Sequence, residues 1–117
     1  MIYLATPYTH ADPAVMERRF QVVNRVAGDL MGNGEVVFSP ISHGHPIAKC
    51  GVRVDWWQWK DLSERMLMAC DRVIVLRQAG WEESIGVCAE IAIARKLGMD
   101  VSYFGSVEAE DEQSRNT

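Results

Sequence analysis

The stretch CDRVIVLRQAGWEESIGVCAEIAIARKLG, residues 70–98, decides the fold class. Residues 71–76, DRVIVL, are expected to form a strand, and their apolar run VIVL is typical of a strand buried on both faces of a parallel sheet. RQAG at 77–80 marks a loop, and residues 83–97 have the composition of a helix. A buried strand followed at once by a helix predicts one unit of an α/β fold.

The same alternation extends through the rest of the chain. Asp12 and Pro13 are a favourable N-cap and first residue for a helix that ends at GNG, residues 32–34. The segment 42–55, SHGHPIAKCGVRVD, has no clear period and is expected to be irregular. Further strands are expected at 1–5, within 35–41 and at 100–105, and a further helix at 56–70. We therefore predict an α/β fold with a parallel sheet of four to five strands and helices on both faces.

Composition limits the function classes. The 117 residues are enough for one domain, expected at 1–105, and the acidic tail 106–117 is expected to be flexible. A net charge of -4 argues against binding of a nucleic-acid polymer, and no run approaches the length of a membrane span. Three isolated cysteines indicate free, mostly buried thiols in a reducing cytoplasm.

Ligands of parallel sheets bind at the carboxyl ends of the strands. In this chain that edge is formed by three loops, 6–12, 39–55 and 77–84. We expect the functional residues to lie there.

Glu90 is the one charged residue between Ile85 and Ala94. Ser84 and Gly86 stand at the start of the same helix, where free N–H groups and the helix dipole favour an anion such as phosphate. Glu90 follows Gly86 by four residues, one turn deeper on the same face. Alternatively, Ser84 only caps the helix, and Glu90 reaches the surface or pairs with an arginine.

The first loop supplies a second set of candidates. The backbone around Thr6 and Pro7 is expected to form one wall of a pocket, with Tyr3 and Tyr8 beside it. Tyr3 is otherwise a core residue and Tyr8 a loop cover. Arg19 either pairs with a phosphate or is a solvated helix arginine.

The second loop raises the question of a metal. His43, His45 and Cys50 do not have a standard zinc spacing, so we expect no metal and treat His45 as a loop histidine beside a ligand or a structural one. Three tryptophans at 56, 57 and 59 suit a core or a dimer surface, and one of them could stack on a base. The chain contains neither a phosphate-binding GxxxxGK[ST] loop nor GxGxxG after the first strand, and we expect no cofactor.

Three stretches, YLATPYTH (3–10), FSPISHGHP (38–46) and residues 70–98, together resemble the nucleoside 2-deoxyribosyltransferase superfamily, in particular a branch of short bacterial and phage proteins. The resemblance implies a flavodoxin-like fold, a three-layer α/β/α sandwich. It also implies a homodimer or a dimer of dimers with active sites near the interface. It implies that Glu90 attacks the anomeric carbon of a sugar and that Tyr3 orients this carboxylate. The SxGxxxE form at 84–90 resembles nucleoside 5'-monophosphate N-glycosidases, in which the serine and glycine hold the 5'-phosphate.

One position departs from that family's pattern. Where the family has an aspartate that assists with the sugar or the base, this chain has Ser63, and Asp61 could replace it only in a different helix register. The expected function is cleavage of the base–sugar bond of a nucleoside 5'-monophosphate, with a wet cleft and Tyr3 keeping Glu90 ionised. A non-catalytic nucleotide-binding module and a deoxyribosyltransferase are the alternatives.

Overall fold

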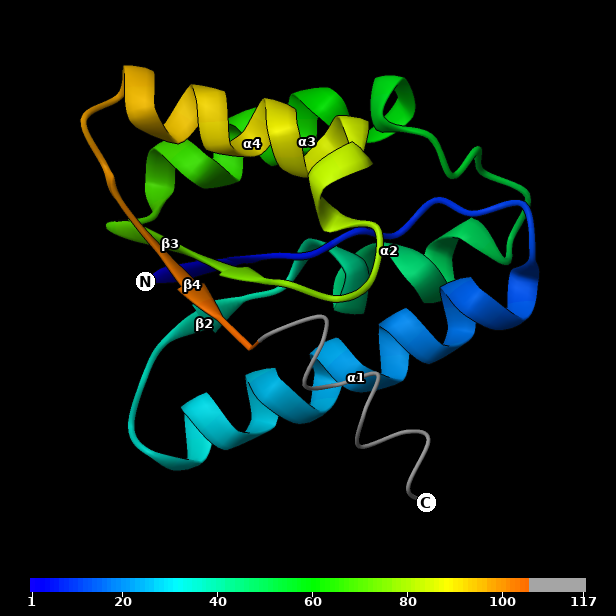
Figure 1. The fold of residues 1–117 in the computed structure, drawn as a ribbon, viewed down its shortest axis with the longest axis horizontal. Helices are drawn as coiled ribbons and strands as arrows, with labels where there is room; N and C mark the ends of the chain where they lie inside the picture. Colours follow the sequence, from blue (N-terminus) through cyan, green and yellow to red (C-terminus); the bar gives the residue numbers. More distant parts are fainter. Residues whose placement is uncertain (106–117) are drawn as a thin grey trace.

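The computed structural model describes residues 1–105, so the expected flexibility of 106–117 lies outside the described residues. Its sheet has four parallel strands in the order β2-β1-β3-β4, which confirms the predicted α/β fold. Helices cover both faces (Figure 1). In chain order the elements are β1 (Ile2–Ala5), α1 (Pro13–Gly32), β2 (Val37–Phe38), α2 (Pro40–Ala48), α3 (Trp56–Ala69), β3 (Arg72–Leu76), the 3-10 turn η1 (Trp81–Glu83), α4 (Ile85–Lys96) and β4 (Asp100–Phe104).

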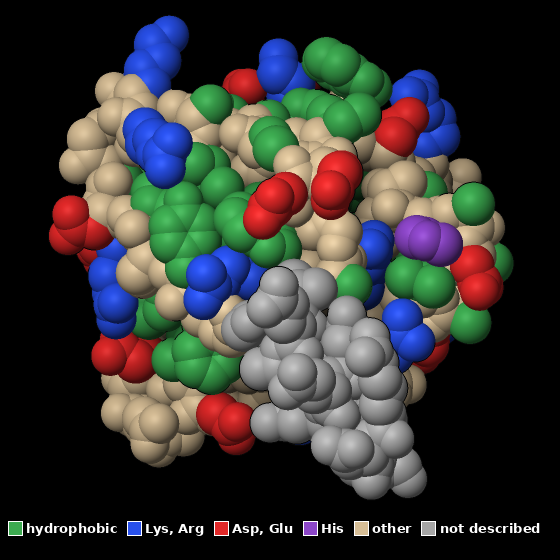
Figure 2. Space-filling model, in the orientation of Figure 1, with side chains coloured by type: hydrophobic (Ala, Val, Ile, Leu, Met, Phe, Trp, Pro, Cys, Tyr) green, Lys and Arg blue, Asp and Glu red, His purple; other side chains and the backbone are tan. Residues whose placement is uncertain are grey.

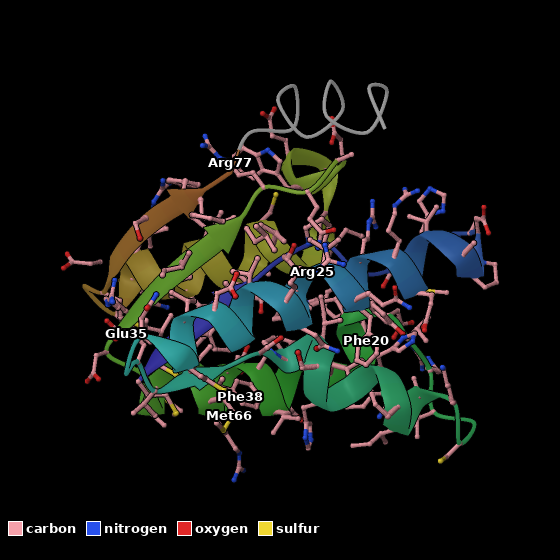
Figure 3. The ribbon with its side chains drawn as sticks, turned by 90° about the horizontal axis from the view of Figure 1, so that it is seen from below. Phe20, Arg25, Glu35, Phe38, Met66 and Arg77 are labelled. Carbon is pink, nitrogen blue, oxygen red and sulfur yellow. The ribbon has the colours of Figure 1, made fainter. Side chains whose placement is uncertain are left out.

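Side-chain alternation along β1 divides the core into two layers. Ile2 and Leu4 belong to the cluster that packs against α1 and α2, whereas Tyr3 and Ala5 belong to the cluster under α3 and α4. Phe20 of α1 packs against the first cluster, and Phe38 of β2 packs against the second (Figure 3). The alternation therefore points Tyr3 toward the helix that carries Glu90.

Helix starts follow the capping rules used above. The side chain of Asp12 accepts a hydrogen bond from the N–H of Ala14 at 2.9 Å, directly before Pro13 at the start of α1. Asp55 caps α3 in the same way, accepting from the N–H of Gln58 at 3.1 Å. The predicted positions of α1 and α3 are confirmed.

The segment 39–55 is more regular than its sequence indicates. Ser39 caps α2, Pro40 occupies its first turn, and α2 tolerates Pro46 near its end. A β-carbon added to Gly44 would lie 3.4 Å from the Trp59 ring, so the absence of a side chain lets α2 approach α3 closely. The prediction of an irregular loop through residues 42–48 is wrong because burial against neighbouring elements overrides weak helix propensity.

The edge strand β4 is the least covered part of the sheet. Tyr103 and Phe104 are 39% and 56% exposed, and hydrophobic side chains gather on the face that carries β4 (Figure 2). Among the described residues, no helix combines the length and the apolar character needed to cross a membrane.

Candidate active site

A cavity of about 340 Å³ lies where the three predicted loops meet. The first loop contributes Thr6 and Tyr8 to its wall, α2 contributes His45, and the start of α4 contributes Ser84 and Gly86. Glu90 also lines it. The structure thus brings together six of the residues considered from the sequence: Thr6, Tyr8, His45, Ser84, Gly86 and Glu90.

Glu90 is buried, with 5% of its surface exposed. It lies on the face of α4 that packs on the sheet, between Val87 and Ala94. The hydroxyl of Tyr3 donates a hydrogen bond to its Oε2 atom. This arrangement excludes the alternative in which Glu90 reaches the surface or pairs with an arginine.

Burial controls the protonation of Glu90. It raises the pKa of this carboxyl from 4.5 to about 8, although the hydrogen bond from Tyr3 acts in the opposite direction. Glu90 of the free protein is therefore mostly protonated at neutral pH, and the expectation that a wet cleft keeps it ionised is wrong. Burial, and then the neighbouring Glu90 charge, also raise the pKa of Tyr3 well above its ordinary value.

The start of α4 combines capping with open donors. Ser84 Oγ accepts from the N–H of Val87 at 3.2 Å, so Ser84 is the N-cap of this helix. The N–H groups of Ile85 and Gly86 belong to the first turn, which has no acceptors within the helix. A β-carbon at Gly86 would lie 4.0 Å from Glu90 Oε1, and this close spacing lets one small ligand contact both the helix start and the carboxyl group.

Arg19 is not placed as a phosphate ligand. Its buried guanidinium donates to the carbonyls of Tyr8 and Thr9, each at 3.2 Å, and to that of Ala79 at 2.8 Å. A β-carbon at Gly80, where φ is +90°, would lie 2.9 Å from Arg19 Nη2. Arg19 thus fastens the first loop to the third, which corrects both readings of its role, the phosphate ligand and the solvated arginine.

Thr6 and Pro7 hold the start of the first loop in place. Thr6 Oγ1 donates to the carbonyl of Leu76 at 2.9 Å and accepts from Gln78 Nε2 at 3.0 Å. Pro7 is fully buried and does not line the cavity, so its part in a pocket wall is corrected to a packing role.

The register of α3 decides which of Ser63 and Asp61 faces the cavity. Ser63 is 4% exposed and lines the cavity. Burial raises the pKa of Tyr3, and hydrogen bonding with Ser63 acts in the opposite direction. Asp61 is exposed and lies outside the cavity, which corrects the expectation that it replaces the missing aspartate. Two residues along a helix turn its direction by about 200°, so both positions cannot face the same space.

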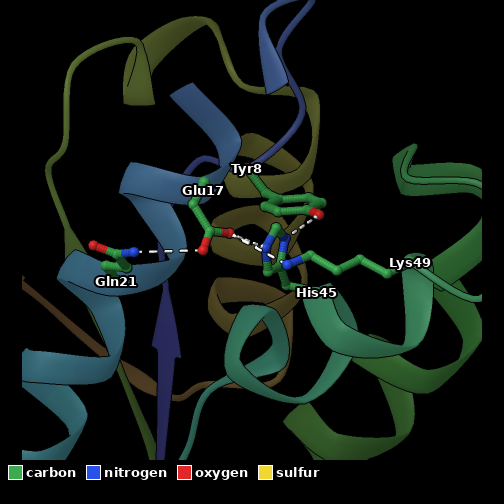
Figure 4. Close-up of polar contacts among 5 residues, drawn as sticks. All are labelled: Tyr8, Glu17, Gln21, His45 and Lys49. Atoms are coloured by element: carbon green, nitrogen blue, oxygen red, sulfur yellow. Dashed lines mark hydrogen bonds and ion pairs between the residues drawn. The ribbon is translucent and has the colours of Figure 1, made fainter. Parts of the chain in front are cut away.

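His45 forms the centre of a network that the sequence did not indicate (Figure 4). Its Nδ1 atom lies 2.7 Å from the hydroxyl of Tyr8, and its Nε2 atom lies 2.5 Å from Glu17 Oε2. Glu17 was not selected, because nothing local in the sequence links it to a residue 28 positions away. Within residues 1–105, no three His, Cys, Asp or Glu side chains are grouped so as to hold a metal ion.

Aromatic side chains form another part of the cavity wall. Trp56, Trp57 and Trp59 all line it, and Trp57 is 68% exposed. The indole N–H of Trp59 donates to the carbonyl of Arg53 at 2.8 Å, which fixes this ring. A planar, partly apolar ligand matches such a wall.

The cysteines differ in part from expectation. All three lie in the described part of the chain and are free, but only Cys70 is buried, whereas Cys50 and Cys88 are exposed. The prediction of mostly buried thiols is therefore wrong.

Comparison with known proteins places the chain in a family. Residues 1–106 match the model described as "Domain of unknown function (DUF1937)". The chain belongs to the DUF1937 family. No curated protein matches it. The DUF1937 description names no activity, so the function of this DUF1937 protein has to be argued from the cavity itself.

Proposed function

We propose that this DUF1937 protein is an N-glycosidase that cleaves the base–sugar bond of a nucleoside 5'-monophosphate. The observation that carries the proposal is the hydrogen bond from the hydroxyl of Tyr3 to Glu90 at a cavity wall. A carboxylate held in this way is positioned to attack an electrophilic carbon of a bound ligand. Attack on the anomeric carbon would release the base and leave a glycosyl ester, which water then hydrolyses.

The surroundings of Glu90 support a phosphorylated substrate. Ser84 and the first turn of α4 offer donors for an anion within a few ångströms of the carboxyl group. The tryptophan wall offers a surface for a base. A sugar is the part of a nucleotide that would then lie beside Glu90.

The pKa of Glu90 sets a condition on this mechanism. With a pKa of about 8, roughly one molecule in ten carries an ionised Glu90 at pH 7. Positive charge that develops at the anomeric carbon during bond cleavage favours the ionised form. Activity is therefore expected to rise with pH as Glu90 loses its proton.

A non-catalytic nucleotide-binding module is the second candidate. It is favoured by the protonated state of Glu90 in the free protein and by Ser63, which cannot supply the charge of an aspartate. Transfer of the sugar to a second base, instead of to water, is the remaining variant of the first candidate. A homodimer or dimer of dimers in the cytoplasm belongs to the same proposal, and exposed Trp57 and Ile85 at the cavity support an interface there.

The test is release of free base from a panel of ribo- and 2'-deoxyribonucleoside 5'-monophosphates and the matching unphosphorylated nucleosides, followed by chromatography. We expect release from at least one monophosphate and loss of about 10³-fold or more in Glu90→Gln. Glu82→Gln, an exposed glutamate outside the cavity, is the matched control and should retain activity.

Intact-mass measurement after rapid acid quenching adds an independent readout. A sugar-phosphate adduct on the native chain, absent in Glu90→Gln, is the expected intermediate. Binding of nucleotides without any turnover supports the binding module instead. Base exchange in the presence of a second free base supports transfer. Undiminished base release by Glu90→Gln contradicts the role of Glu90.

A further inference from the structure

A second group able to carry a proton faces the cavity that contains Glu90. Tyr8 lines this cavity, and its hydroxyl lies 2.7 Å from His45 Nδ1. The other ring nitrogen of His45 lies 2.5 Å from Glu17 Oε2. The three side chains come from the first loop, α2 and α1, and Figure 4 shows them as a continuous chain of polar contacts.

The imidazole in the middle of these contacts is buried, and the carboxylate at their far end is open to water. His45 is 6% exposed, with the ring of Phe20 at 4.3 Å between centroids and the ring of Tyr8 at 5.5 Å in an edge-on arrangement. The side chain of Glu17 is 41% exposed and also lies 3.7 Å from the ammonium group of Lys49. The chain of contacts thus connects the cavity with solvent through a buried imidazole.

We propose that Tyr8 is the acid that protonates the departing base, and that His45 and Glu17 are positioning residues that return a proton to it. This inference rests on the proposed N-glycosidase function. It adds a specific role for a residue that the sequence marked only as a pocket wall or a loop cover.

The proton and electron balance is complete with these groups and a proton from solvent. An oxygen of ionised Glu90 bonds to the anomeric carbon as the carbon–nitrogen bond breaks, and the electron pair of that bond stays on the base. The base takes the proton of the Tyr8 hydroxyl, and the Tyr8 oxygen takes the Nδ1 proton of His45. The Nε2 atom of His45 takes a proton that enters from solvent at Glu17. When water opens the glycosyl ester, its proton passes through Tyr8 to His45 Nδ1, and the Nε2 proton leaves to solvent at Glu17.

The other acidic groups at the cavity, Asp55, Glu83 and Glu90, suit this role less well. Glu83 lies exposed on η1. Hydrogen bonding from Arg53 lowers the pKa of Asp55, so this carboxyl is ionised and has no proton to give. Glu90 is already used as the nucleophile. Burial, and then the charge of Glu17, raise the pKa of Tyr8, so this phenol keeps its proton at neutral pH. Hydrogen bonding with His45 lowers the pKa of Glu17, which keeps an anion beside the imidazole.

The experiment compares two leaving groups. One substrate is a nucleoside 5'-monophosphate that the wild-type protein cleaves, and the other is the matching 4-nitrophenyl glycoside 5-phosphate, from which nitrophenolate departs without a proton. Tyr8→Phe should lower kcat on the nucleotide by about 10²-fold or more and change nitrophenolate release by less than about threefold. Glu17→Gln, at a half-exposed position, should lower kcat on the nucleotide by about tenfold with KM unchanged.

Three controls separate the possible failures. Tyr103→Phe, a tyrosine outside the cavity, should behave as wild type on both substrates. Glu90→Gln should lose both activities, and the thermal midpoint of each variant reports folding. If Tyr8→Phe loses kcat equally on both substrates, or loses none on the nucleotide, the role of Tyr8 is overturned. In that case release of nitrophenolate that depends on Glu90 still supports the glycosidase. If the wild-type protein releases neither base from any nucleoside 5'-monophosphate of the panel nor nitrophenolate from the glycoside, the proposed function is overturned and this inference with it.

Discussion

Replacement of Glu90 by Gln is expected to stabilise the protein at neutral pH. In the folded state Glu90 is buried and its pKa is about 8, whereas 4.5 is its ordinary value in an unfolded chain. Between these two values the unfolded state ionises and the folded state does not, so rising pH favours unfolding. Gln is neutral, has almost the same shape, and can accept the hydrogen bond from Tyr3 through its amide oxygen.

The size of the effect follows from the two pKa values. Below pH 4.5 Glu90 is protonated in both states and its stabilising contribution is fully present. That contribution is lost at about 1.36 kcal/mol per pH unit as the pH rises toward the folded value. At pH 7 the loss amounts to about 3 kcal/mol, and above pH 8 it levels off at about 5 kcal/mol. A difference of 3 kcal/mol is a large part of the stability of an ordinary domain.

Urea unfolding at pH 5, 7 and 8.5 measures this difference. Glu90→Gln should exceed the wild-type free energy of unfolding by less than about 1 kcal/mol at pH 5 and by about 3 kcal/mol at pH 7. Glu82→Gln, which changes an exposed glutamate on η1, should differ little from wild type at every pH. A gap between Glu90→Gln and wild type that does not grow with pH would refute the argument that burial holds Glu90 in its neutral form.

Two further outcomes concern the neighbours of Glu90. Tyr3→Phe removes the hydrogen bond that lowers the pKa of Glu90. The rise of kcat/KM with pH is expected near pH 8 in the wild-type protein, and it should move to higher pH in this variant. A pH profile that does not move contradicts this coupling. Ser84→Ala removes the acceptor of the Val87 N–H and should lower the free energy of unfolding by about 1 kcal/mol in urea. It should also reduce kcat/KM for a monophosphate more than for the nucleoside, and equal reductions would remove Ser84 from the phosphate site.

The features predicted correctly from the sequence are those encoded locally. The Asp12–Pro13 start of α1 and the apolar run of β3 depend on neighbouring residues, and both are found in the structure. Glu90 was recognisable because a single carboxyl interrupts an apolar helix, a pattern that needs no knowledge of the fold. The helix α2 was missed because its stability comes from burial of Ile41, Gly44 and His45 against other elements.

The roles assigned wrongly depend on contacts between distant segments. Arg19 has the chemistry of a phosphate ligand, but the carbonyls that surround it come from two loops, one of them 60 residues away. Asp61 and Ser63 could be distinguished only after the buried face of α3 was known, because that face is set by Leu67 and the sheet beneath it. Sequence spacing therefore identified the residue types of the site better than their partners.

The raised pKa of Glu90 does not by itself decide between an enzyme and a binding module. Ionising a group whose pKa lies one unit above the working pH costs about 1.4 kcal/mol, or a factor of ten in rate. Enzymes lower barriers by about 8 kcal/mol or more, so this cost is small beside the gain that a positioned nucleophile and a proton donor provide. The two candidates differ more sharply at Tyr8, elsewhere on the cavity wall. A module that only binds nucleotides has no need of a tyrosine linked through a buried imidazole to a solvent-exposed carboxylate, whereas a reaction that expels a base needs a supply of protons there. Release of free base by the wild-type protein is therefore the measurement that separates the two, and Tyr8→Phe, tested with a leaving group that needs a proton and with one that does not, then shows whether Tyr8 supplies that proton.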